Sequence, residues 1–213
     1  MVRVRATRTL ENAARRAGHL RIAGVDEVGR GCLAGPVVAA AVVLDPSRHI
    51  PGLADSKLLS AAERERLFGV ITRKALAWAV GSASPAEIDA LNIHHASLEA
   101  MRRAVWALEP QPDLLLVDAF RVPGVTMRQQ GIVGGDRRCA AIAAASIVAK
   151  VLRDREMVAW DAADPRYGYG RHKGYGTAAH LEALARHGYS ALHRQSFRPR
   201  ALRDAADHAS SAT

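Results

Sequence analysis

The sequence predicts an α/β fold in which a mixed β-sheet is flanked by helices and followed by a small helical segment at the C-terminus. Two apolar, β-rich runs open it, Arg21 to Val28 and Pro36 to Leu44, with a glycine-rich turn between them. Later in the chain, short apolar runs alternate with helical patterns. A tight turn makes neighbouring strands antiparallel, whereas a helical crossover makes them parallel, so we expect strands in both directions.

Two helix starts carry the same capping sequence. Ser60 precedes Glu63 by three residues, and Ser84 precedes Glu87 in the same way, with a proline at the first helical position. In this pattern the serine and the glutamate side chains satisfy backbone amides that have no partner inside the helix. We therefore predict that helices begin after both serines.

The remaining elements follow from the spacing of apolar residues. From Ile93 to Leu108 these residues keep helical spacing and predict one buried face. The run Asp113 to Asp118 predicts a short buried strand, Gln130 to Gly135 a further strand, and Arg138 to Trp160 a long helix. Alanine fills the first half of this last segment, which permits close backbone packing.

Composition divides the chain into one main domain and three smaller parts. Residues 21–160 carry the predicted sheet, and residues 1–20 form a short basic helical arm. Residues 161–203 form a C-terminal segment that carries glycine and tyrosine. Residues 204–213 have the composition of a disordered tail.

The bulk properties are those of a protein that folds without covalent staples. With 213 residues, 49% of them hydrophobic, the chain can bury a core without disulfides or a structural metal. Cys32 and Cys139 do not form a disulfide framework, so we expect reduced thiols in the cytosol. The longest apolar run, Val37 to Leu44, is too short to cross a bilayer, and no secretory signal is recognisable. The expectation is a cytoplasmic monomer without membrane contact.

The net charge of +9 favours a polyanionic partner. Lysine and arginine contacts to phosphate release counterions and dominate the affinity of proteins for nucleic acid. Charge alone leaves an alternative open, because abundant arginine and alanine can also reflect coding bias.

Several of the 21 acidic residues stand inside or directly after apolar sequence. Asp26 and Glu27 end the first strand, Asp118 ends a run of leucine and valine, and Asp136 follows two glycines. A buried carboxylate needs a cation, a hydrogen-bond donor or water. Any one of these residues could simply cap a helix or end a strand, but the four together favour a shared site for a hard divalent cation such as Mg²⁺.

The pair Asp26 and Glu27 poses a geometric problem. Successive residues of a regular strand point to opposite faces, so both carboxylates can face one site only if the strand bends between them. Gly29 and Gly31 make such a bend possible, because glycine adopts backbone conformations closed to other residues and lets a ligand approach the main chain.

The motif Asp26-Glu27-Val28-Gly29-Arg30-Gly31, followed by Leu33-Ala34-Gly35-Pro36, resembles the signature of the ribonuclease HII family. The resemblance runs from about residue 20 to 200 and includes further motifs in the family's order. These are Asp55-Ser56-Lys57, Asn92-Ile93 with Ala96-Ser97-Leu98, Val117-Asp118, Gly135-Asp136, Ile142 to Ile147 with Ala149-Lys150-Val151, Arg153-Asp154, and His172 to Thr177.

This resemblance implies a ribonuclease H-like catalytic domain over residues 21–160 and a substrate-contacting segment over residues 161–203. It implies four catalytic carboxylates, Asp26, Glu27, Asp118 and Asp136, that hold two Mg²⁺ or Mn²⁺ ions. The implied substrates are RNA/DNA hybrids and DNA that contains single ribonucleotides. Cleavage by a metal-activated water would leave 5′-phosphate and 3′-hydroxyl ends without a covalent enzyme intermediate.

The resemblance also assigns substrate contacts. It implies that Gly29, Arg30 and Gly31 read the ribose 2′-hydroxyl through main-chain groups, and that Tyr175 packs on the next sugar, which favours cleavage 5′ to a lone ribonucleotide. Ser56 and Lys57 would contact phosphate. Each assignment has a plainer alternative: a tight turn for the glycines, a half-buried aromatic for the tyrosine, and an ordinary loop for the serine and lysine.

Other polar residues are assigned more loosely. Asp154, on the long helix with Lys150 and Arg153, would orient neighbouring groups rather than bind metal. Four residues of the C-terminal segment face either the duplex or solvent, namely His172, Lys173, His193 and Arg194. The chain departs from the family pattern at Gly134, where relatives often have a basic residue, and at Cys139-Ala140, where a hydroxyl residue is common, which weakens expectations for phosphate contacts near Asp136.

Three rival functions remain at this stage. Ribonuclease HIII shares the acidic pattern, but it has a long N-terminal domain and another residue in the glycine turn, where this chain has Arg30. Another two-metal nuclease or transposase-like enzyme of the same fold would not explain His172 to Thr177. A noncatalytic nucleic-acid-binding protein would keep its function after Asp26→Asn.

Overall fold

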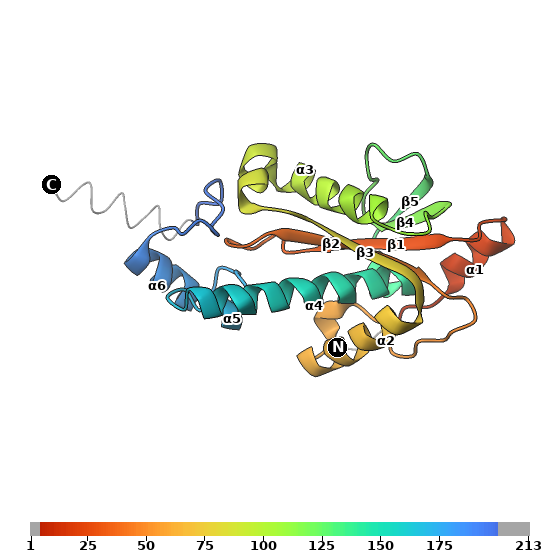
Figure 1. Cartoon of the computed structure of the whole chain (residues 1–213), viewed down its shortest axis with the longest axis horizontal. Coiled ribbons are helices and arrows are strands. Elements are labelled where there is room, and N and C mark those ends of the chain that lie inside the picture. The colour runs from red at the N-terminus through yellow and green to blue at the C-terminus, as the bar shows by residue number, and fades with distance from the viewer. Residues whose placement is uncertain (1–4, 200–213) are drawn as a thin grey trace.

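The computed structural model describes residues 5–199, which fold around one five-stranded sheet with the order β3-β2-β1-β4-β5 (Figure 1). β1 pairs antiparallel with β2, and β2 pairs antiparallel with β3. β4 pairs parallel with both β1 and β5. The predicted mixed sheet is therefore confirmed. Its strands are β1 (Ile22–Val28), β2 (Val37–Leu44), β3 (Ala75–Ala83), β4 (Leu114–Asp118) and β5 (Arg128–Ile132).

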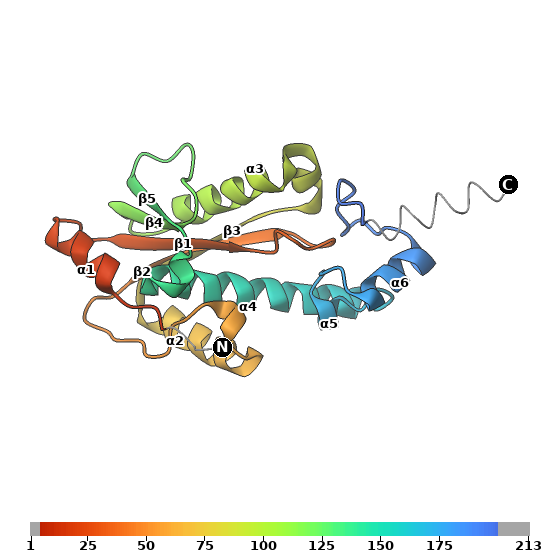
Figure 2. The same cartoon turned by 180° about the vertical axis from the view of Figure 1, so that it is seen from behind.

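Helices cover both faces of this sheet. Figure 2 shows α3 on one face and α4 with α2 on the other. The helical elements are α1 (Thr9–Arg16), η1 (Ser56–Leu58), α2 (Ala61–Lys74), α3 (Pro85–Trp106), η2 (Gly135–Arg137), α4 (Ala140–Ala163), α5 (Tyr169–His172) and α6 (Ala178–His187). Both predicted capping boxes are present, at Ser60 before α2 and at Ser84 before α3.

Two glycines allow the long helices to lie directly on the strands. A Cβ atom added to Gly24 of β1 would lie 2.1 Å from the backbone carbon of Ala141 in α4. On the other face, a Cβ atom at Gly81 of β3 would lie 2.3 Å from the carbonyl oxygen of Ala100 in α3. Since real Cβ atoms do not approach so closely, any side chain at either position would push the helix away from the sheet.

The hydrophobic core has two layers, because the strand residues alternate between the two faces. Val38, Ala40 and Val42 of β2 pack with the alanine-rich half of α4 and with α2. Their neighbours Ala39 and Ala41 pack with α3. Both faces of β2 are thus buried, and so its sequence is continuously apolar rather than alternating.

Three sequence-based expectations about the elements need correction. β5 begins two residues before the predicted strand and ends at Ile132, and α4 continues to Ala163. β3 was not predicted at all. It is an edge strand in which small buried alanines alternate with exposed Leu76, Trp78 and Val80, so apolar residues occupy both faces and no polar alternation marks it.

The N-terminal helix is confirmed, but it is not a free arm. Glu11 of α1 is buried, and its Oε1 accepts a hydrogen bond from the backbone amide of Ala141 at 2.8 Å. Thr7 also forms an isolated bridge with Cys139. The segment therefore docks on the start of α4. The predicted tail at residues 204–213 lies outside the described residues.

Cys32 and Cys139 are both free and buried, as expected for reduced thiols. Among residues 5–199, no helix is long and apolar enough to cross a membrane.

Candidate active site

The four predicted carboxylates meet where β1 and β4 end. Asp26 and Glu27 lie in the last part of β1, Asp118 is the last residue of β4, and Asp136 lies in the short helix η2. Asp118 interacts electrostatically with each of the other three carboxylates. One edge of the sheet therefore gathers charges from three separate parts of the chain.

Asp26 is buried at the end of β1. Burial raises the pKa of its carboxyl well above the usual range, and the nearby charges of Glu27 and Asp118 raise it further. Hydrogen bonds from the Ser146 hydroxyl and from the Glu27 amide, which lies 2.8 Å from Oδ1, favour the ionised form. Ser146 in turn is hydrogen-bonded to the Ser56 hydroxyl at 2.9 Å.

Glu27 and Asp136 also have carboxyl groups whose pKa is raised by burial and by neighbouring negative charges. Burial raises the pKa of Glu27, and Asp118 adds to that effect, while Arg30 opposes it with Nη1 lying 3.7 Å from Oε1. Burial likewise raises the pKa of Asp136, together with the charges of Asp55 and Asp118, against Lys57 and Arg137. Because these negative charges lie close together, a cation bound among them would reduce their mutual repulsion.

The predicted bend between Asp26 and Glu27 is not present. Pairing with β2 continues without a register shift through both residues to Val28, and the backbone turns at Gly29, where φ is +98°. The two side chains reach a common neighbourhood for another reason. Pairing of β1 with β4 ends at Val25, so the edge of β1 is open beyond that residue. Asp118 can then interact with carboxylates from both faces.

The side-chain oxygens suit a hard divalent cation, but the described residues do not by themselves surround one. All four side chains offer oxygen, the ligand that Mg²⁺ and Mn²⁺ prefer. Within the described part of the chain, Glu27 Oε2 is buried without a hydrogen-bond partner. In the same part, no three or more histidine, cysteine, aspartate or glutamate side chains are arranged to surround an ion. The residues therefore fit metal binding that is completed by other ligands.

A hollow of about 190 Å³ lies beside Glu27 and collects the predicted substrate-binding residues. Gly29, the first residue of the glycine turn, could not carry a side chain, since its Cβ atom would lie 2.3 Å from Arg153 Nε. At Gly31 a Cβ atom would meet nothing within 4 Å. The lining consists of Glu27, Val28, Gly29, Arg30, Gly31, Ser56, Lys57, Ser146, Lys150 and Tyr175.

Asp154 lies one helical turn beyond the hollow and contacts Lys150. Its Oδ1 accepts a hydrogen bond from the ammonium group of Lys150 at 2.8 Å, and its Oδ2 lies 3.9 Å from Arg64. The same ammonium nitrogen lies 5.6 Å from the centre of the Tyr175 ring. This arrangement orients Lys150 toward the hollow.

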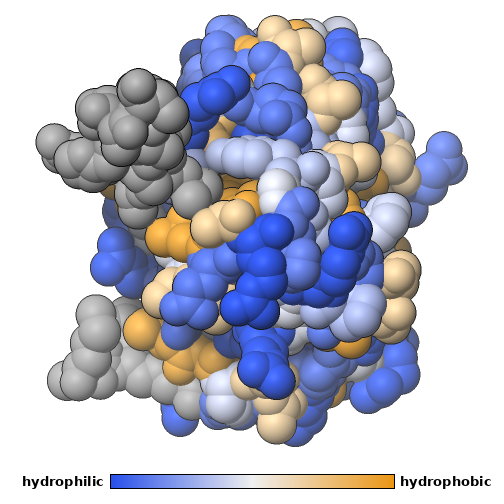
Figure 3. All heavy atoms as spheres, turned by 90° about the vertical axis from the view of Figure 1, so that its left-hand side faces the viewer, coloured by the Kyte–Doolittle hydropathy of each residue, from blue (hydrophilic) through white to orange (hydrophobic). Residues whose placement is uncertain are grey.

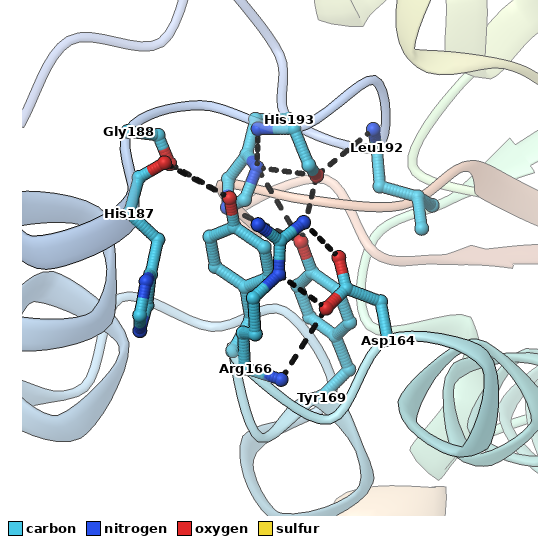
Figure 4. Close-up of polar contacts among 9 residues, drawn as sticks. Asp164, Arg166, Tyr169, His187, Gly188, Leu192 and His193 are labelled. Atoms are coloured by element: carbon cyan, nitrogen blue, oxygen red, sulfur yellow. Dashed lines mark hydrogen bonds and ion pairs between the residues drawn. The ribbon is translucent and has the colours of Figure 1, made fainter.

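The C-terminal segment corrects an expectation about polar residues. Neither the duplex-facing nor the solvated alternative holds for His172, His193 and Arg194, because all three are buried. His193 is 1% exposed and stands among tyrosine rings and the loop 188–192 (Figure 4). Lys173 is half-buried, and its ammonium group donates to the carbonyl of Gly170.

Two imidazoles link this segment to the backbone of Tyr175. The Ser190 amide donates to His193 Nδ1 at 2.9 Å, so His193 Nε2 carries the proton and donates to His180 Nε2 at 3.0 Å. His180 Nδ1 then donates to the carbonyl of Tyr175 at 2.9 Å. Burial lowers the pKa of both histidines, to about 4 for His193. Neutral rings therefore support the loop that carries Tyr175.

Sequence reasoning left Ser146 and Arg153 without a role, and it placed Arg194 at the surface although the residue is buried. Ser146 is a single hydroxyl in an alanine run, which was a usable signal. The two arginines gave none, because charged residues are exposed in most proteins and no local pattern marks a buried one.

The chain is similar to known proteins over most of its length. A family model described as ribonuclease HII matches residues 23–199. The ribonuclease HII of Vibrio cholerae is 57% identical over 183 residues, which cover 86% of this chain and 89% of that protein. Among solved structures, ribonuclease H2 from Pyrococcus horikoshii is similar with a TM-score of 0.71 and 26% identity, over 84% of this chain and 94% of that one.

A more distant structure shares the fold. It is Bst-RNase HIII in complex with Mn²⁺, with a TM-score of 0.65 and 23% identity, over 87% of this chain and 69% of that one.

Proposed function

This chain belongs to the ribonuclease HII family and is a hydrolytic nuclease of the ribonuclease H class, and from that premise we propose that it incises 5′ to single ribonucleotides in duplex DNA as well as cutting the RNA strand of RNA/DNA hybrids. One observation carries this proposal. The crowded carboxylates of β1, β4 and η2 adjoin a hollow that exposes the backbone of a glycine turn. This arrangement supports a cut next to a nucleotide that main-chain groups of the turn can contact.

The proposed metal ligands are Asp26, Glu27, Asp118 and Asp136, holding two Mg²⁺ or Mn²⁺ ions. When bound, two such ions activate a water and stabilise the attacking and leaving oxygens of a phosphodiester. Support comes from the all-oxygen donor set and from the buried Oε2 of Glu27, which has no hydrogen-bond partner among residues 5–199. The related Bst-RNase HIII structure contains Mn²⁺. Because Mg²⁺ usually binds one or two carboxylates together with substrate phosphate, we expect the substrate to complete the site.

The chain's own residues would then position the strand. The ammonium groups of Lys57 and Lys150 lie around the hollow, where they can bind phosphate next to the carboxylates. The Ser146 hydroxyl keeps Asp26 oriented, and Ser56 holds Ser146. The visible surface on the left-hand side of Figure 1 is mostly hydrophilic (Figure 3). Together with the net charge of +9, this surface suits a nucleic-acid duplex.

The selective contacts are proposed to come from the glycine turn and from Tyr175. A ribose 2′-hydroxyl is both donor and acceptor, so main-chain groups of Gly29, Arg30 and Gly31 can recognise it and a deoxyribose cannot satisfy them. The Tyr175 ring is 39% exposed and stands on the rim of the same hollow. Its flat surface can pack on the neighbouring deoxyribose, which would place the cut on the 5′ side of the ribonucleotide. The products would carry 5′-phosphate and 3′-hydroxyl ends.

The decisive experiment uses an end-labelled DNA duplex with one embedded ribonucleotide. We expect a single cut 5′ to that nucleotide with Mg²⁺ or Mn²⁺ and no cut with chelator. An all-DNA duplex of the same sequence is the control for specificity. Binding without cleavage under every metal condition would instead support a noncatalytic nucleic-acid-binding protein, and cleavage of the hybrid alone would remove the junction activity.

A further inference from the structure

Arg194 is a buried cation whose partners are backbone carbonyl groups. Its side chain is 0% exposed. Nη2 donates to the carbonyl of Gly29 at 2.7 Å, Nη1 donates to that of Arg30 at 2.9 Å, and Nε and Nη2 both donate to that of Gly35. No carboxylate in the described part of the chain lies within ion-pair distance of this guanidinium. Three carbonyl groups of one turn, together with the nearby charge of Asp89, therefore compensate the cation.

This arrangement strongly constrains the turn. Burial lowers the pKa of Arg194 to about 10, so the group remains charged at neutral pH. A buried charge is costly unless hydrogen bonds satisfy it, and losing one of its acceptors would leave a donor unpaired. The carbonyls of Gly29, Arg30 and Gly35 must therefore keep facing the guanidinium. The Phe197 ring, 5.0 Å from the guanidinium carbon, covers it further.

The direction of these carbonyls determines the direction of two amides. In a planar trans peptide the N–H of one residue points opposite to the C=O of the residue before it. Because the carbonyls of Gly29 and Arg30 point at Arg194, the amides of Arg30 and Gly31 point away from it. Neither of these amides donates a hydrogen bond to any group among residues 5–199. Both residues line the hollow beside Glu27 and Tyr175.

We propose that Arg194 is the positioning residue for ribose recognition: by holding the carbonyls of Gly29 and Arg30, it aims the free amides of Arg30 and Gly31 at the ribonucleotide. This inference rests on the proposed function, since the ligand of the two amides is the ribose of an embedded ribonucleotide. Arg194 itself touches no substrate. Its effect is therefore on discrimination between ribose and deoxyribose rather than on the chemical step.

Arg153 provides a matched comparison within the same molecule. It is also 0% exposed, and it also donates to three carbonyl groups, those of Ala34, Pro36 and Lys173. None of these belongs to the two peptide units that carry the amides of Arg30 and Gly31. A lysine at either position keeps the charge but loses the planar fork of donors. The two substitutions thus cost similar contacts but differ in which peptides they release.

The test measures equilibrium binding in chelator, so that no cleavage occurs, to a duplex with one ribonucleotide and to the all-DNA duplex of the same sequence. The preference for the ribonucleotide is the Kd of the all-DNA duplex divided by that of the ribonucleotide duplex. For Arg194→Lys we expect this ratio to fall about tenfold, with all-DNA binding unchanged, because hydrogen bonds to the ribose are misdirected. Arg153→Lys should lower the thermal midpoint of unfolding about as much as Arg194→Lys does, but it should leave the ratio unchanged.

Each result has a separate meaning. If the wild-type protein shows no preference for the ribonucleotide duplex, the proposed function is at fault rather than the role of Arg194. A preference that survives in folded Arg194→Lys overturns the inference, and so does an equal loss in Arg153→Lys. Should Arg194→Lys fail to fold, Phe197→Leu replaces it: a smaller reduction of the ratio is expected, and an unchanged ratio overturns the proposal.

Discussion

The carboxylate of Asp118 accepts a hydrogen bond from the backbone amide of Gly135 at 2.7 Å. This contact joins the end of β4 to the turn that carries Asp136, so two of the four carboxylates belong to one connected unit. Gly135 also packs tightly there, since a Cβ atom on it would lie 2.5 Å from a methyl carbon of Ile142 in α4. The position of Asp136 relative to Asp118 therefore depends on α4 as well as on the sheet.

Asp118→Asn should separate folding from catalysis. Asparagine keeps an oxygen that can accept the Gly135 amide, so the fold should persist, but it removes the charge proposed to bind metal. We expect Mg²⁺-dependent cleavage to fall by about a hundredfold or more while duplex affinity is retained. The matched control is Asp164→Asn, which changes a carboxylate paired with Arg166 in the C-terminal segment. Unchanged turnover in Asp118→Asn would contradict the proposed metal ligands, and Asp136→Asn should behave like Asp118→Asn.

Tyr175→Ala should affect one substrate more than the other. Its ring borders the hollow and can pack on the sugar next to the cut, which matters most when a single ribonucleotide must be located within DNA. We expect incision at a lone ribonucleotide to fall at least several times more than cleavage of a long RNA/DNA hybrid, measured as kcat/KM. Tyr175→Phe keeps the ring and serves as the control. Equal losses on both substrates would remove the junction role.

Alanine substitutions at the two glycines of the turn should have different effects, one on stability and the other on cleavage. Gly29 has φ of +98° and no room for a Cβ atom, so Gly29→Ala should lower the free energy of unfolding by about 2 kcal/mol or more. Gly31 has open space, so Gly31→Ala should change stability by only about 0.5 kcal/mol. Since that space belongs to the hollow, the added methyl group should still weaken cleavage at a ribonucleotide. A stable Gly31→Ala variant with full activity would show that the substrate backbone does not approach this residue.

The stability of the C-terminal segment should depend on pH through His193. Burial, and then the nearby His180, lower its pKa from 6.5 to about 4. The unfolded chain therefore binds the proton first, so the contribution is fully present above about pH 6.5 and is lost as the pH falls toward about 4. Between about pH 7 and pH 5 this loss amounts to about 2 kcal/mol.

Urea unfolding of the wild type and of His193→Gln measures this contribution. Glutamine does not titrate, so the variant should lose less stability than the wild type between the two pH values, even if it is weaker at both. Parallel losses in the two proteins would mean that His193 is already protonated, or not buried, in the folded state.

Much of the architecture could be predicted because its signals are local. The capping boxes at Ser60 and Ser84 and the apolar runs of β1, β2 and β4 each depend on a few adjacent residues. β3 could not be predicted from alternation of polar and apolar residues, because both its exposed and its buried face are apolar. The bend expected between Asp26 and Glu27 was wrong because the open edge of β1 beyond Val25 already lets both carboxylates reach Asp118.

The sequence by itself determined the mixed α/β fold and the family resemblance, since both rest on short local motifs, and it predicted the four carboxylates only when they were considered together. Only the tertiary structure decided that Asp118 is the common neighbour of the other three, and that His193 and Arg194 are buried supports rather than surface groups. The reason is physical. Burial, charge crowding and the direction of a peptide group are properties of everything that packs around a residue, and for Arg194 those neighbours lie more than a hundred and fifty residues earlier in the chain.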